Sequence, residues 1–138
     1  MDIYAALEQH GVPYEKYDHP PVMDMAESAV HCAHIPGAPS VNLFVHGKRS
    51  RKNILLVLAG RKNAPWKELK RMLGEEVTLN RDANEMQELL GCTPGSVSLL
   101  GLVNDTARAV RVLIDRELWK EETLHYHPPG DNTATLVI

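Results

Sequence analysis

Residues 41–58 read VNLFVHGKRSRKNILLVL and carry the clearest structural pattern in the chain. Two apolar runs, Val41 to His46 and Asn53 to Leu58, are typical of β-strands. The polar residues 47–52 between them predict a hairpin loop. This loop would project several cations from a fixed base, because both strands would hold it in place.

Shorter helical and extended patterns surround this hairpin. Capping residues, glycine stops and helical spacing predict a helix that Asp2 caps and Gly11 ends, helices over Met25 to Ala33, Pro65 to Leu73 and Asp82 to Leu90, and one helical turn over Glu117 to Lys120. Extended segments are expected at Tyr14 to Asp18, Val77 to Leu79, Ala109 to Ile114, Leu124 to Tyr126 and Thr133 to Ile138. The elements follow no strict βαβ rhythm, so we expect a single α+β domain over residues 1–138 with a mixed sheet.

A chain of 138 residues, 43% hydrophobic and 24% charged, is typical of one soluble globular domain. No apolar run approaches the roughly 20 residues that cross a bilayer, and the N-terminus has no evident signal peptide. Two cysteines do not make a disulfide framework. We therefore expect a cytoplasmic protein with no membrane partner. The chain ends at Ile138 within an expected strand, so either that strand is terminal or a following helix is absent from this sequence.

Positive charge is concentrated between residues 48 and 71. This segment contains nine basic residues and one acidic residue, a net charge of +8, whereas the rest of the chain has 6 basic and 17 acidic residues. A polyanion would be attracted to this segment, although a solvated surface explains the same pattern. Trp66 is its only aromatic residue, which argues against a stacking platform for single strands. The basic residues are Lys48, Arg49, Arg51, Lys52, Arg61, Lys62, Lys67, Lys70 and Arg71.

Metal and nucleophile chemistry find little support in the sequence. His31, His34, His125 and His127 would share faces in pairs, but their spacing matches no zinc site, and we expect no metal. No Gly-x-Ser-x-Gly elbow and no glycine-rich phosphate loop is present, so we expect neither a serine hydrolase nor a cofactor. Pro128 holds the backbone of His127 extended. Two interpretations of His127 are open: its ring would hydrogen-bond at the lip of a pocket, or it would be a partly exposed residue at the end of a strand.

Three short segments place small or polar residues beside strand-like apolar runs, where a backbone can approach a ligand closely. The three segments are Val41 to Phe44, Thr93 to Val97 with Gly101 to Asp105, and His127-Pro128 with Asn132 to Thr135. Together with His19 to Val22 and Arg111 to Asp115, their order and spacing resemble the YbaK family of aminoacyl-tRNA deacylases, which also occurs as the editing insertion domain of bacterial prolyl-tRNA synthetase. The resemblance covers nearly the whole chain.

The resemblance implies a mixed, partly barrel-like sheet flanked by helices, with a small pocket between them. It also implies hydrolysis of the ester of a mischarged aminoacyl-tRNA after the synthetase has released it. The subgroup that this chain resembles most is the free-standing alanyl-tRNA(Pro) deacylases. The partner is then the acceptor end of a tRNA, with a synthetase as a further candidate and no role for DNA.

The resemblance also assigns site residues. Asn42 would orient the substrate amine or carbonyl, backbone N–H groups near Gly101 would stabilise the oxyanion, and His127 would position the ribose or relay a proton. The size of the pocket would exclude the larger cognate side chain. The implied substrate contacts are Pro20, Val41, Gly95, Ser96 and Leu102, and the implied contacts to acceptor-stem phosphates are Lys48, Arg49, Arg51 and Lys52.

One position departs from the family pattern. Relatives carry lysine where this chain has Val41, and that lysine is the family's main functional side chain. Valine neither hydrogen-bonds nor carries charge. A second interpretation is therefore open, in which the chain is a catalytically silent module that binds aminoacyl-tRNA, an amino acid or a synthetase; restoring lysine at position 41 is then expected to raise activity. Pro129 stands where leucine is common, which would reshape the pocket wall.

Overall fold

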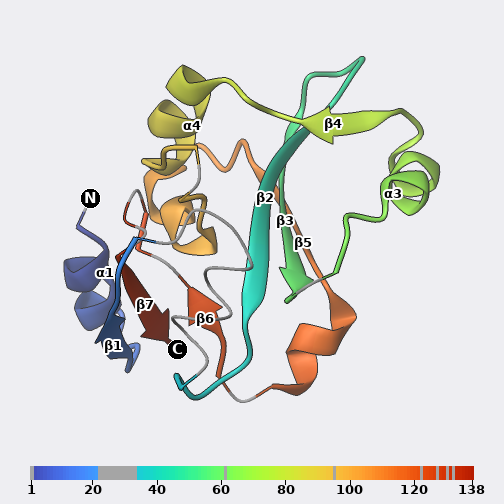
Figure 1. The fold of residues 1–138 in the computed structure, drawn as a ribbon. Helices are drawn as coiled ribbons and strands as arrows, with labels where there is room; N and C mark the ends of the chain where they lie inside the picture. The colour runs from blue at the N-terminus through green and yellow to red at the C-terminus, as the bar shows by residue number, and fades with distance from the viewer. Residues whose placement is uncertain are drawn as a thin grey trace.

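The computed structural model describes residues 2–21, 34–60, 62–94, 96–121, 123–126, 128–129, 131 and 133–138. Its larger sheet is built on β2 (Ser40–Gly47) and β3 (Asn53–Ala59), an antiparallel pair with Val41 opposite Leu58. β4 (Val77–Leu79) pairs antiparallel with β2, and β5 (Arg111–Ile114) pairs parallel with β3, giving the order β4-β2-β3-β5 (Figure 1). The predicted hairpin is confirmed.

A second sheet is antiparallel and has the order β1-β7-β6, formed by β1 (Glu15–Asp18), β7 (Ala134–Val137) and β6 (His125–Tyr126). One parallel bridge between Ala38 and Leu124 connects it to the segment that leads into β2. The expected α+β class is confirmed. The partly barrel-like closure is not, because the described strands form two sheets that meet at this bridge rather than one closed barrel.

Local capping explains where the helices begin and end. Asp2 accepts the N–H of Tyr4 at 3.0 Å at the start of α1 (Ile3–Gln9), and Asp82 accepts two first-turn N–H groups of α4 (Ala83–Leu90). Gly74 and Gly91 end α3 (Trp66–Leu73) and α4 with positive φ, which glycine adopts without steric cost. These predicted helices and the turn η2 (Arg116–Lys120) are confirmed, whereas the predicted helix over Met25 to Ala33 lies outside the described residues. In the described ranges, no helix is long and apolar enough to cross a membrane.

The structure contains a helix that the sequence did not predict, between Pro94 and Arg108. Residues Leu99–Asn104 form a 3-10 helix, η1. Ser98 caps this helix by accepting the N–H of Leu100 at 3.2 Å, and Asn42 of β2 accepts the N–H of Leu99 at 2.7 Å. The second of these acceptors comes from a distant strand, so local pattern could not reveal this helix.

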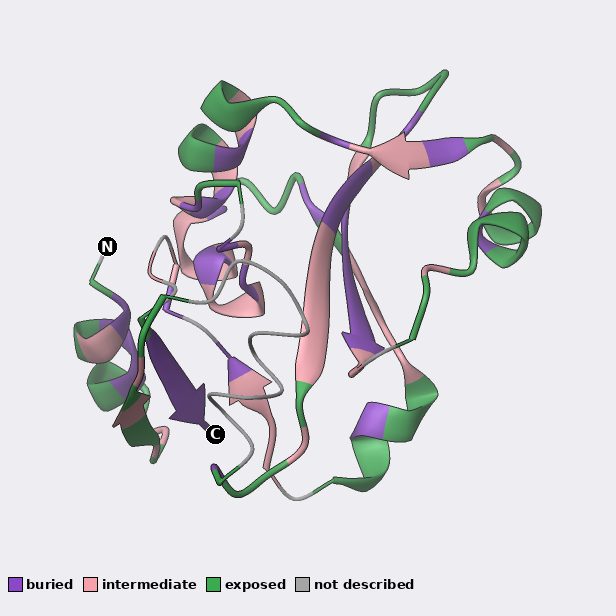
Figure 2. Ribbon diagram, in the orientation of Figure 1, coloured by how far each residue is buried: buried purple, intermediate pink, exposed green. Residues whose placement is uncertain are grey.

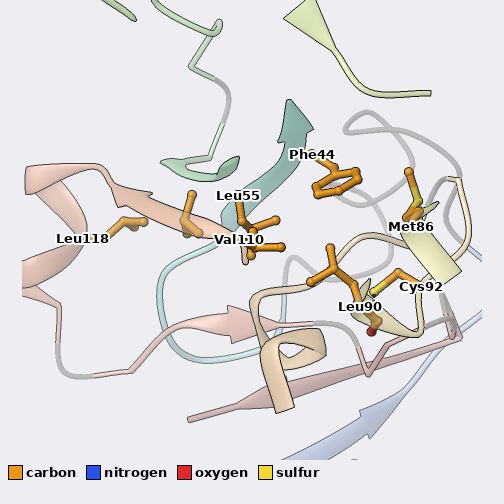
Figure 3. Packing of buried hydrophobic residues seen from close by; sticks show 8 residues of the cluster. Phe44, Leu55, Met86, Leu90, Cys92, Val110 and Leu118 are labelled. Atoms are coloured by element: carbon orange, nitrogen blue, oxygen red, sulfur yellow. Dashed lines mark hydrogen bonds between the residues drawn. The ribbon is translucent and has the colours of Figure 1, made fainter. Parts of the chain in front are cut away.

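The strand β2 separates two hydrophobic cores, because successive side chains alternate between the faces of a sheet. On one face Phe44 belongs to a buried core with residues of α4 (Figure 3). On the other face Val45 belongs to a core with residues of α3. Figure 2 shows β3 buried between these layers, while the hairpin loop is exposed. Asn42 therefore lies on the α4 side of the sheet and Val41 on the α3 side.

Candidate functional site

A chain of hydrogen bonds centred on Asn42 joins the first of the three segments to residues that lie next to the other two in the sequence. The Asn42 Oδ1 atom accepts the N–H of Leu99 at 2.7 Å, and its Nδ2 atom donates to Ser40 Oγ at 3.3 Å. Ser40 Oγ in turn donates to the carbonyl oxygen of His125 at 2.7 Å. Since an N–H can only donate, Leu99 fixes which way the half-buried Asn42 amide points. These hydrogen bonds hold β2, η1 and β6 together. The residue of β6 that takes part, His125, lies two positions before His127 in the sequence.

Gly101 lies close to this network but contributes differently from what was predicted. Its N–H donates to the Ser98 carbonyl at 2.9 Å, so this amide is used within the turn and does not present itself to a ligand. A Cβ atom at this position would lie 2.5 Å from the carbonyl oxygen of Leu90. Glycine is therefore required by the close packing of η1 on the end of α4. The N–H of Gly101 itself is engaged within the turn, and an oxyanion role for other backbone N–H groups near Gly101 stays a prediction.

The predicted substrate contacts occupy different settings. Ser96 is 4% exposed, and its hydroxyl lies 2.7 Å from that of Thr93, so it stabilises the turn before η1. Leu102 is half-buried against the core that contains Phe44. Pro20 is exposed, and its carbonyl oxygen lies 2.9 Å from a ring nitrogen of His19. Gly95 and His127 lie outside the described residues.

Val41 faces away from Asn42. Its half-buried side chain packs against the core beneath α3, together with Leu43. Adjacent residues of a strand point to opposite faces, so a side chain at position 41 starts on the far side of the sheet from the Asn42 network. Replacement of the family lysine by valine consequently leaves the hydrogen bonds of Asn42 intact.

The four predicted phosphate contacts all lie in the exposed β2–β3 loop, at residues Lys48, Arg49, Arg51 and Lys52. Two glutamates beyond the basic segment fold back onto this loop. Glu75 accepts the N–H groups of Arg49 and Ser50 at 3.0 and 2.9 Å, and these hydrogen bonds, led by that of Ser50, hold the pKa of its carboxyl below the usual value. Glu76 pairs with Lys48 at 3.4 Å. The local positive charge is thus smaller than the sequence segment suggested, and only the tertiary structure shows it.

A groove of about 780 Å³ runs from the base of this loop over β4. Arg51 and Arg81 reach it without an ion-pair partner in the part of the chain that the structure describes. His46 of β2 also contacts the groove, and about four residues of extended strand, on the order of 13 Å, separate it from Asn42. This groove could not be predicted from the sequence, because the residues that line it come from separate elements. The lining residues are His46, Lys48, Arg51, Trp66, Val77, Thr78, Leu79, Asn80, Arg81, Asp82 and Glu85.

Two other features bear on the chemistry. Among the described residues, no three His, Cys, Asp or Glu side chains come together as a metal site. A second cavity, of about 570 Å³, is lined by Asp2, Glu88 and Asp131 beside Pro128 and Pro129. Its acidic lining has the wrong sign for a polyanion, so the groove over β4 is the better candidate for contact with phosphates.

Comparison with known proteins identifies the family of this chain. Residues 19–138 match the aminoacyl-tRNA editing domain family. The chain is 34% identical over 122 residues to prolyl-tRNA synthetase associated domain-containing protein 1 of Danio rerio, covering 88% of this chain and 66% of that protein. It is 26% identical over 136 residues to the prolyl-tRNA editing protein ProX of Acetoanaerobium sticklandii, covering 99% of this chain and 82% of that one.

A solved structure shares the fold. It is described as that of a candidate trans-editing enzyme for prolyl tRNA synthetase, with a TM-score of 0.73 and 17% identity, over 99% of this chain and 83% of the other. The likeness to this structure concerns the fold alone, whereas the family match covers the segments that Asn42 joins. From the family match, this chain belongs to the aminoacyl-tRNA editing domain family.

Proposed function

We propose that this protein hydrolyses the ester bond of a mischarged aminoacyl-tRNA, and that Ala-tRNA(Pro) is its substrate. The observation that carries the proposal is the Asn42 network. The Nδ2 atom of Asn42 has two hydrogens, and Ser40 Oγ is its one acceptor among the described residues. The second hydrogen has no acceptor in the described part of the chain, and we propose that it is offered to the ligand. An N–H that Leu99 and Ser40 hold in place is suited to polarise the ester carbonyl and stabilise the oxyanion.

An aminoacyl ester is already reactive, so a fixed donor and a positioned water molecule are sufficient. Water attacks the carbonyl carbon, the oxyanion accepts the Asn42 N–H, and the ribose hydroxyl leaves with a proton. His127 is proposed to supply or relay that proton at the ribose end. A confined pocket would select small amino acids by excluding the larger proline side chain. No metal or cofactor enters the proposed reaction.

The basic loop and the groove over β4 are proposed to hold the acceptor stem. Lys48, Arg49, Arg51 and Lys52 would contact phosphates, with Arg81 on the opposite wall of the groove. At about 3.4 Å per stacked nucleotide of one strand, the separation of roughly 13 Å along β2 corresponds to about four nucleotides. This spacing allows the 3′ end to reach Asn42 while the stem lies on the loop.

One observation favours a second candidate function. Val41 replaces the family lysine and packs against the α3 core, so a cation is missing from this strand. The alternative is therefore a silent module that binds aminoacyl-tRNA or a synthetase without hydrolysing the ester. If the deacylase centred on Asn42 is correct, we expect Val41→Lys to change turnover by less than about threefold, because position 41 faces away from Asn42. The silent module predicts instead that this substitution raises activity.

A deacylation assay across a panel of mischarged tRNAs, read beside tRNA binding, separates the two functions. Enzyme-dependent release of alanine from Ala-tRNA(Pro), faster than release of proline from Pro-tRNA(Pro), supports the deacylase. Release equal to the enzyme-free rate with tRNA still bound supports the silent module. A large gain of activity in Val41→Lys would show that the lysine acts from this strand despite its register.

A further inference from the structure

Two proline carbonyls, near the two ends of the connection between β1 and β2, are each contacted by a histidine ring. The Pro20 carbonyl oxygen lies 2.9 Å from His19 Nδ1, and the Pro36 carbonyl oxygen lies 2.7 Å from His125 Nε2. A carbonyl oxygen can only accept, so the nitrogen that faces it must carry the hydrogen. The two contacts therefore specify two different protonation patterns, Nδ1–H in His19 and Nε2–H in His125.

His19 connects its proline to the interior of the β1-β7-β6 sheet. Its Nε2 atom lies 2.8 Å from the hydroxyl of Thr135, which is 2% exposed in β7. In a neutral ring with hydrogen on Nδ1, Nε2 accepts this hydroxyl. The backbone N–H of His19 also donates to the Thr133 carbonyl at 2.9 Å. The imidazole thus links a buried threonine to the exposed Pro20.

His125 connects the other proline to Asn42. Besides the ring contact with Pro36, the backbone N–H of His125 donates to the Ala38 carbonyl at 2.9 Å, and its own carbonyl accepts from Ser40 Oγ at 2.7 Å. The three contacts are made to every second residue, Pro36, Ala38 and Ser40, of the segment that leads into β2. Ser40 is also the acceptor for the Asn42 amide, so His125 is one residue removed from the proposed catalytic donor.

Proline makes the carbonyl the natural point of attachment. It has no backbone N–H, and its ring fixes φ, so one hydrogen bond to the carbonyl sets the direction of the chain. Pro20 and Pro36 lie near the two ends of the connection between β1 and β2. His125 belongs to β6 of the small sheet, and His19 directly follows β1 of the same sheet. This role was not predicted for either histidine from the sequence. His125 was considered only as a possible metal ligand, and no metal site was expected.

We propose that His19 and His125 are positioning residues that fix these two proline carbonyls, and that His125 thereby holds Ser40 and Asn42 in their reactive geometry. The expected effect on catalysis rests on the proposed deacylase function. Loss of the hydrogen bond from the His125 ring displaces Ser40 and lowers kcat, because the Asn42 donor shifts from the carbonyl. Loss of the hydrogen bond from the His19 ring frees Pro20, an implied wall of the pocket, and weakens discrimination between alanine and larger amino acids.

The first test does not depend on the function. A long-range ¹H–¹⁵N spectrum of the full chain, recorded where the imidazoles are neutral, reports which ring nitrogen carries hydrogen. We expect Nδ1–H for His19 and Nε2–H for His125. The opposite pattern at either residue, or rapid averaging between both forms, overturns the proposal for that residue. The Thr135→Val variant should shift the His19 signals and leave those of His125 unchanged.

The second test uses matched variants. A glutamine amide nitrogen reaches approximately the place of Nε2, and an asparagine amide nitrogen that of Nδ1. We expect His125→Gln to keep kcat within about threefold and His125→Asn to lower it about tenfold or more, with little change in KM for the tRNA. His19→Asn should keep the selectivity for alanine, and His19→Gln should reduce it. His10→Ala, at the exposed end of α1, is the control.

Each outcome of the second test decides something. Equal losses in the asparagine and glutamine variants of one histidine would indicate a role other than the hydrogen bond, and would overturn the proposal. If the unmodified protein does not deacylate any tRNA, the proposed function fails, and the side-chain amide signals of Asn42 become the readout. Those signals should move in His125→Asn and stay in His125→Gln; if they stay in both, His125 does not position Asn42.

Discussion

Replacing Asn42 by aspartate removes one hydrogen-bond donor and leaves the shape of the side chain unchanged. The remaining oxygen still accepts the Leu99 N–H, which lies 2.7 Å from Oδ1 in the structure. The Nδ2 donor disappears, and with it the hydrogen proposed to bind the oxyanion. A carboxylate beside a developing negative charge is also repulsive. Asn42→Asp therefore tests the chemical role of Asn42 with little disturbance of η1.

The size of the effect follows from what such donors contribute. Loss of one oxyanion donor costs about 2.7–4 kcal/mol of transition-state stabilisation, or roughly 100- to 1000-fold in kcat. The hydrogen bond to Ser40 Oγ is long, at 3.3 Å, so its loss should change the free energy of unfolding by less than about 1 kcal/mol. Asn42→Ala is a less suitable variant, because it leaves the Leu99 N–H without its acceptor and costs about 1–3 kcal/mol of stability.

The assay is single-turnover deacylation of Ala-tRNA(Pro), with thermal unfolding and tRNA binding measured on the same preparations. We expect Asn42→Asp to unfold near the temperature of the unmodified protein and to bind uncharged tRNA comparably. Its chemical step should be at least about 100-fold slower. A rate within threefold of the unmodified protein would refute the proposed donor. An equal loss of tRNA binding would mean that Asn42 acts in binding rather than in the chemical step.

Three further outcomes are expected. Gly101→Ala should lose about 1–3 kcal/mol of stability, measured by denaturant unfolding, because its methyl group would lie 2.5 Å from a backbone carbonyl oxygen; unchanged stability would contradict the packing role. Charge reversal at Arg51 and Arg81 should weaken tRNA binding and lower the slope of log K against log salt by about 0.7–0.9 for each phosphate that the protein no longer neutralises, whereas reversal at the exposed Lys120 should not. The pKa of Glu75 is lower in the folded chain, so its contribution to stability is present above its unfolded pKa and is lost as pH falls through the folded value. Acid titration followed by loop amide signals should therefore show the loop loosening only as pH falls below the ordinary glutamate pKa, and Glu75→Gln should remove that transition.

Local sequence was sufficient for most elements of the fold. The hairpin of β2 and β3 follows from two apolar runs around a polar loop, and the helix ends follow from Asp2, Asp82, Gly74 and Gly91. Each of these residues determines the backbone structure only of the few residues next to it in the sequence. The family, too, was accessible, because the order of short motifs along the chain survives even where single residues such as Val41 differ.

The candidate site depended on contacts between residues far apart in the chain. Asn42 meets Leu99 across 57 positions and, through Ser40, meets the carbonyl of His125. The hydrogen bond from Leu99 also anchors the first residue of η1, a helix that the sequence did not predict. Two other features also depend on contacts between distant residues. They are the opposite faces of the sheet on which Val41 and Asn42 lie, and the contact of Glu75 with the basic loop. Local patterns specify which elements form, but which side chains share a site depends on how those elements pack, and packing energy arises only once distant segments meet.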